Sequence, residues 1–105
     1  MATDRFRELV NIIITQAQEL NEELEDKIDV DAREDAPLFG KEGILKSIEL
    51  VNLIVAVEQA VEDQFDVFLT LADEKAMSQK TSPFKTIGAL AAYIEKRMDE
   101  EMDQA

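Results

Sequence analysis

The chain has 105 residues, 24 of them acidic and 11 basic, and its formal net charge is -13 although 46% of its residues are hydrophobic. This length suits one domain, here residues 1–105, and the hydrophobic fraction is too high for a disordered chain. Because cysteine and histidine are both absent, we exclude disulfides and thiolate metal sites and expect no enzymatic activity from the chain itself.

The first predicted element is a long amphipathic helix that begins at Thr3 or Asp4 and extends to about Asp26. Its apolar side chains recur every three or four residues, which is the spacing of one helix face. This face comprises Phe6, Leu9, Val10, Ile13, Ala17, Leu20 and Leu24, and it is widened by Ile12 and Ile14. The charged run 21–26 is compatible with a helix, so the sequence leaves the end of this element open.

A long loop is predicted from Ile28 to Lys46, because this segment contains Pro37 and two glycines and lacks helical periodicity. Its apolar anchors are Leu38, Phe39, Ile44 and Leu45. An ordered loop of this length in a small domain is usually functional. The sequence therefore predicts a functional role for this loop or for the residues that directly follow it.

The alternating aspartates of residues 29–35 raise the alternative of a calcium-binding loop. Such a loop needs an oxygen ligand at its fifth position, a glycine at the sixth and a glutamate at the twelfth. This chain has Arg33, Glu34 and Gly40 at those positions. A solvated charge cluster is the better interpretation.

A second helix is predicted from Ser47, acting as the N-cap, to Asp63 or Gln64, with Glu49 placed favourably for the helix dipole. Its predicted buried residues are Leu50, Val51, Ile54, Val55, Val57, Val61 and Phe65. Many of these are β-branched, which leaves a strand over residues 48–57 as an alternative. The serine cap and the polar segment 58–65 favour the helix.

Two more helices complete the prediction. Thr70 and Asp73 have the spacing of a capping box before a short third helix, Leu71 to Met77, which a loop from Ser78 to Pro83 follows. A last helix is capped by Thr86 and has apolar residues at helical spacing, namely Ile87, Leu90, Ala91, Ile94 and Met98. The acidic tail 99–105 is expected to fray. Three longer helices and one short helix predict an all-α fold, a small four-helix bundle.

The segments "LFGKEGILKSIELVNLIVAVEQAVEDQF" and "TIGALAAYI" resemble the acyl carrier protein family. The resemblance spans about residues 38–94, and the first helix fits in type although it is longer than usual. It implies a bundle of acyl-carrier-protein type in which Ser47 carries a covalent 4'-phosphopantetheine arm, which would make the chain a phosphoprotein. Ile48 replaces the family's leucine after this serine, and Lys46 stands where the family has aspartate.

The implied function is to hold acyl intermediates as thioesters on the arm and to deliver them to enzymes of fatty acid or specialised lipid synthesis. The implied partners are a phosphopantetheinyl transferase and acyl-processing enzymes whose basic patches would dock on the acidic residues Glu49, Glu58, Glu62 and Asp63. Because Lys46 departs from the family pattern, the alternative is an unmodified acidic helical module that binds other proteins.

The apolar residues between the helices are candidates for lining an acyl chain, and they are Ile54, Val55, Val61, Leu71 and Ile94. A packed core explains the same residues equally well. The acidic balance disfavours nucleic acid and anionic membranes. With no signal-peptide pattern and no apolar run of membrane-spanning length, we expect a cytoplasmic monomer that does not insert into membranes.

Overall fold

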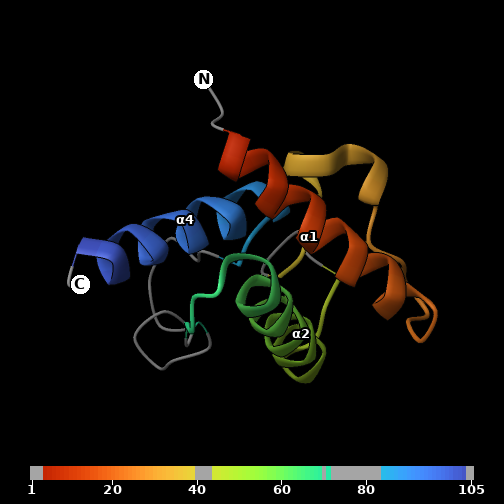
Figure 1. Cartoon of the computed structure of the whole chain (residues 1–105). Coiled ribbons are helices and arrows are strands. Elements are labelled where there is room, and N and C mark those ends of the chain that lie inside the picture. Colours follow the sequence, from red (N-terminus) through yellow and green to blue (C-terminus); the bar gives the residue numbers. More distant parts are fainter. Residues whose placement is uncertain (1–3, 40–43, 70, 72–83, 104–105) are drawn as a thin grey trace.

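The computed structural model describes residues 4–39, 44–69, 71 and 84–103. Within these residues the chain is entirely helical apart from its connections, and the elements in order are α1 (Asp4–Asn21), the 3-10 helix η1 (Val30–Asp35), α2 (Ser47–Phe65) and α4 (Ile87–Asp103). Helix α1 crosses the molecule and packs against α2, α4 and η1 (Figure 1). The predicted small helical bundle is confirmed, and the strand alternative for residues 48–57 is wrong, because those residues are helical.

Helix α1 contributes the predicted face to the core, and its buried residues are Leu9, Val10, Ile12, Ile13 and Ala17. The helix ends at Asn21, so the predicted extension to about Asp26 is wrong. The reason is a local clamp, because the Asn21 side chain accepts a hydrogen bond from the Ile28 N–H at 2.7 Å and donates one to the Ile28 carbonyl at 3.0 Å. Lys27 also donates to the carbonyl oxygens of Asn21 and Leu24. The chain therefore turns back and buries Leu24 and Ile28.

The segment after α1 is more regular than predicted, because η1 occupies part of the expected loop. The loop then runs beside the entry to α4, where the Leu38 N–H donates to the Lys85 carbonyl at 2.8 Å and the Ile87 N–H donates to the Ala36 carbonyl at 3.1 Å. Of the predicted anchors, Leu38 and Leu45 are buried, while Phe39 and Ile44 pack partly buried against the core. The loop is thus fixed at both ends.

Helix α2 buries Leu50, Ile54, Val57 and Val61 as predicted. Val55 is 44% exposed, so its predicted burial is wrong, and the missed Leu53 is only 1% exposed. Successive residues are ~100° apart around the helix axis, so Val55 lies outside the face through which its neighbour Ile54 packs against the core.

Helix α4 begins as predicted, because the Thr86 hydroxyl oxygen accepts a hydrogen bond from the Ala89 N–H at 3.0 Å. Its five predicted core residues are all fully buried. The helix continues to Asp103, through most of the tail for which the sequence predicts fraying. Arg5 of α1 binds that extension, with Nη2 at 2.5 Å from Asp99 Oδ1.

The predicted capping box and short third helix lie outside the described residues, apart from Leu71, which is fully buried. None of the described helices combines the length and the apolarity needed to cross a lipid bilayer.

Candidate functional site

The segment Lys46–Ser47–Ile48 forms the start of α2. Lys46 is the N-cap, with an extended backbone, and Ser47 is the first helical residue, so the predicted serine N-cap is wrong. The Lys46 carbonyl accepts the first intrahelical hydrogen bond, from the Leu50 N–H at 2.9 Å. The Glu49 carboxylate turns back and accepts a hydrogen bond from the Lys46 N–H at 2.8 Å. A carboxylate of the first turn therefore caps the start of the helix, and no side-chain hydroxyl takes part.

The core fixes this segment on either side. Leu45 precedes it and is 6% exposed, with its N–H bound to the Leu38 carbonyl at 3.0 Å, and Leu50 follows it and is fully buried. Between these anchors, Lys46 is exposed and Ile48 is 67% exposed. The backbone at Ser47 thus lies between two core residues, Leu45 and Leu50, and has an exposed neighbour on each side.

A surface hollow of about 200 Å³ lies beside the start of α2. Its lining includes Lys46 and four carboxylates, those of Glu23, Glu25, Asp26 and Glu49. These carboxylates disfavour an anion, and the lysine opposes them with a positive charge. Among the described residues, no group of three or more potential ligands is arranged to hold a metal ion.

The four predicted partner-binding carboxylates fall into two pairs. Glu49 is bound to the Lys46 N–H, and Glu58 Oε2 accepts a hydrogen bond from the Leu71 N–H at 2.8 Å. Glu62 and Asp63 are exposed near the C-terminal end of α2. Only the second pair is presented to solvent without a structural hydrogen bond among the described residues.

The predicted acyl-lining residues also fall into two groups, four that are buried and one that is exposed. Ile54, Val61, Leu71 and Ile94 are fully buried and belong to the single hydrophobic cluster that joins the helices. Val55 is excluded from that set because its side chain faces outward. The structure therefore brings the four buried residues together in a core shared with α1 and α4.

One exposed apolar site was missed by the sequence interpretation. Phe68, which follows α2, is 74% exposed, and together with Val55 and Leu69 it lines a hollow of about 320 Å³ that is bordered by Glu58 and Glu62. An isolated phenylalanine after a helix normally indicates burial, so the sequence offers no signal for its exposure. The hollow combines an apolar lining with an acidic border.

No family model, curated protein or solved structure matches this chain. Functional inference therefore starts from the motif and the geometry of the chain itself.

Proposed function

We propose that the protein is an acyl carrier protein that holds acyl intermediates as thioesters on a 4'-phosphopantetheine arm attached to Ser47. The supporting observation is the position of this serine as the first residue of α2, directly after the long anchored loop and between the exposed Lys46 and Ile48. A transferase would have open access to both flanking residues. The chain itself is then a carrier and not an enzyme.

The start of α2 suits a phosphodiester in two respects. The N–H groups of Ser47, Ile48 and Glu49 precede the first residue that can donate within the helix, Leu50, and the positive end of the helix dipole lies at the same place. Lys46 adds a cation that offsets one of the four carboxylate charges of the neighbouring hollow. When bound, the arm supplies a thiol for thioester chemistry, which the side chains of this chain lack.

The partner enzymes in this proposal carry basic patches and act in fatty acid or specialised lipid synthesis. Of the four predicted docking carboxylates, Glu62 and Asp63 are the exposed pair, and Glu62 shares a hollow with the exposed apolar residues Val55 and Phe68. Exposed charges of this kind speed the encounter with a partner of opposite charge. Glu49 and Glu58 would contribute mainly by maintaining the shape of the surface.

An acyl chain that entered the bundle would have to displace side chains that are already packed. Ile54, Val61, Leu71 and Ile94 have no exposed surface. Their use as an acyl lining therefore requires the helices to separate. A melting temperature that rises with the length of the attached acyl chain would support this use.

The absence of cysteine gives the proposal a direct test. After co-expression with phosphopantetheinyl transferases, any labelling by a thiol-reactive maleimide must come from an attached arm, because the chain has no thiol. We expect labelling and a matching mass increment in the intact protein. Both should disappear in Ser47→Ala and persist in the control Thr15→Ala, which removes a hydroxyl from α1. An increment that survives Ser47→Ala would refute the assignment.

The alternative function is that of an acidic helical module that binds other proteins without a prosthetic group. It is favoured by Lys46, which occupies the N-cap position where the acyl carrier family has aspartate. A Lys46→Asp variant distinguishes the two functions. Labelling of the wild-type chain supports the carrier, whereas absence of labelling in both forms with several different transferases supports the module.

A further inference from the structure

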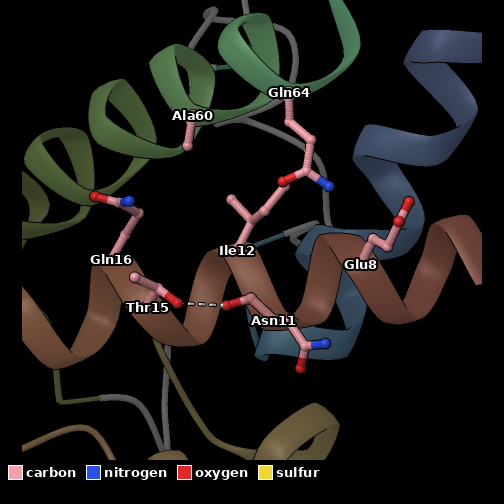
Figure 2. A pocket seen from close by; sticks show the side chains of 7 residues that line it. All are labelled: Glu8, Asn11, Ile12, Thr15, Gln16, Ala60 and Gln64. Atoms are coloured by element: carbon pink, nitrogen blue, oxygen red, sulfur yellow. Dashed lines mark hydrogen bonds between the residues drawn. The ribbon is translucent and has the colours of Figure 1, made fainter.

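A groove with an apolar floor runs along the junction of α1 and α2. Its larger part has a volume of about 410 Å³ and is lined by residues of both helices, including Ile12 and Ala60 (Figure 2). A second hollow of about 240 Å³ adjoins it at Gln16 and includes Leu53 and Ala56. Because Gln16 lines both hollows, we treat them as one feature and name it the α1–α2 groove.

The groove exists because α2 presents small side chains toward α1. Ala56 and Ala60 lie one helical turn apart and line the two hollows. Ile12, which is 8% exposed, and Leu53, which is 1% exposed, provide the apolar floor. A small apolar side chain from another molecule would find apolar surface there.

The carboxamide side chains of Gln16 and Gln64 border the floor, and their donors and acceptors are not used within the described residues. In Figure 2 the Gln64 amide lies over Ile12, and the Gln16 amide extends toward α2. Neither makes a hydrogen bond to another described residue, whereas Asn11 points away from α2 and accepts one from Arg33 Nη2 at 2.8 Å. A carboxamide offers both a donor and an acceptor, which is the complement of a peptide group.

The charges along the groove have one sign. Glu8 and Glu19 of α1 and Glu23, just after that helix, line its two hollows, and no lysine or arginine is found in the described lining. The guanidinium of Arg33 binds the side chain of Asn11, which points away from α2. The groove therefore complements a basic partner and disfavours an anionic one such as nucleic acid.

We propose that the α1–α2 groove binds an extended basic segment of a partner protein. Gln16 and Gln64 hydrogen-bond its backbone, a small apolar side chain rests on Ile12 and Ala60, and lysines or arginines of the segment pair with Glu8 and Glu19. An extended segment fits better than a helix, because a helix already satisfies its own amides and would leave the two carboxamides without partners.

This inference goes beyond the proposed carrier function and does not depend on it. Ala60 is thirteen positions after Ser47 in α2, which corresponds to about 20 Å along the helix axis. Groove binding can therefore be tested on protein that carries no arm. A chain that fails to become modified at Ser47 leaves the groove proposal intact, and the converse also holds.

The test is an NMR titration of the full-length ¹⁵N-labelled chain. The probe is a short peptide in which lysines alternate with alanine and valine, and the comparison peptides replace lysine by glutamate or consist of lysine alone. We expect shifts along α1 and α2 at the groove with the first peptide, none with the glutamate peptide and weaker ones with polylysine. Equal responses to the alternating peptide and to polylysine would overturn the proposal, as would no response to either.

Matched variants separate groove binding from general attraction to an acidic protein. The pair Gln16→Ala and Gln64→Ala should weaken peptide binding by about tenfold, while the exposed pair Gln18→Ala and Gln59→Ala should change it by less than about twofold. The pair Glu8→Gln and Glu19→Gln should weaken it more than Glu100→Gln and Glu101→Gln, which remove the same charge from α4. Equal losses within either comparison would refute a site in the groove.

Discussion

Glu58 and Leu71 join the middle of α2 to the chain beyond its C-terminal end. Glu58 Oε2 accepts a hydrogen bond from the Leu71 N–H at 2.8 Å, and the Leu71 side chain is fully buried. Helix α2 is ended by Asp66, whose left-handed backbone (φ 56°) lets the chain reverse direction. A carboxylate that the sequence assigns to partner recognition therefore satisfies a backbone donor within the fold.

Replacing Glu58 by alanine should lower the free energy of unfolding by about 1–2 kcal/mol, because the Leu71 N–H loses its partner. Glu58→Gln should cost less, since the amide oxygen still accepts a hydrogen bond. The control is Glu62→Ala, one turn further along α2 and exposed. Urea unfolding of the three variants measures the difference. Equal stability of the two alanine variants would show that the hydrogen bond contributes nothing.

Gly88 provides a second test, because it brings α4 close to η1. A Cβ atom at this position would lie 2.9 Å from the Glu34 carbonyl oxygen and 3.1 Å from Glu34 Cβ. Gly→Ala within a helix usually stabilises it by about 0.5–1 kcal/mol. Here the contact with backbone should dominate, so Gly88→Ala should be destabilising by about 1–3 kcal/mol.

The matched control for Gly88→Ala is Ala92→Gly, which reports helix propensity at an exposed position of the same helix. It should cost only about 0.5–1 kcal/mol. Thermal melts followed by circular dichroism compare both variants with wild type. A stabilised Gly88→Ala would mean that η1 can move away from α4.

Truncation of two phenylalanines should lower the stability by very different amounts. Phe84 is 1% exposed and meets the Tyr93 ring edge-on at a centroid distance of 6.1 Å, whereas Phe68 is 74% exposed. Phe84→Ala should cost about 3–5 kcal/mol of unfolding free energy, and Phe68→Ala less than about 0.5 kcal/mol. Denaturant unfolding of both variants is the measurement. A large loss for Phe68→Ala would mean that this ring is buried in solution.

Helical periodicity was sufficient to predict the core faces of α1 and α4. All five predicted residues of α4 are fully buried, because they recur at helical spacing and are bulkier than most of the residues between them, or are separated by charged ones, as before Met98. In α2 the periodicity is blurred by continuous aliphatic residues. The sequence alone therefore did not distinguish the buried Leu53 from the exposed Val55.

Residues 21–26 and the start of α2 show why element ends were harder to predict. Residues 21–26 suit a helix, but Asn21 binds the backbone of Ile28, a contact formed only when the chain folds back. At α2, serine is the better cap by intrinsic preference, yet Glu49 binds the Lys46 N–H, so Lys46 is the N-cap and the helix begins one residue earlier than a Ser47 cap would place it. Side-chain to backbone hydrogen bonds between residues three and seven positions apart decided both ends, and helical periodicity alone carries no signal for them.

The unfolding midpoint should rise with salt, because a net charge of -13 destabilises the compact state through repulsion that salt screens. Arg5 opposes this repulsion locally, since it binds Asp99 and Glu95 across α1 and α4, and its hydrogen bond to Asp99 raises the pKa of the guanidinium. Salt weakens that attraction, so Arg5→Gln should show a steeper rise than wild type. Glu100→Gln with Glu101→Gln should show a shallower one.

The measurement is a set of circular dichroism melts between about 0.01 and 0.5 M NaCl, over which the Debye length falls from ~30 Å to less than 10 Å. At low salt, Arg5→Gln should also have the lowest midpoint of the three proteins, because it removes an attraction and makes the net charge more negative. A midpoint that falls with salt in wild type would show that favourable ion pairs outweigh the repulsion among the acidic side chains. The same ordering at all salt concentrations, with parallel slopes, would show that Arg5 acts through packing and not through its charge.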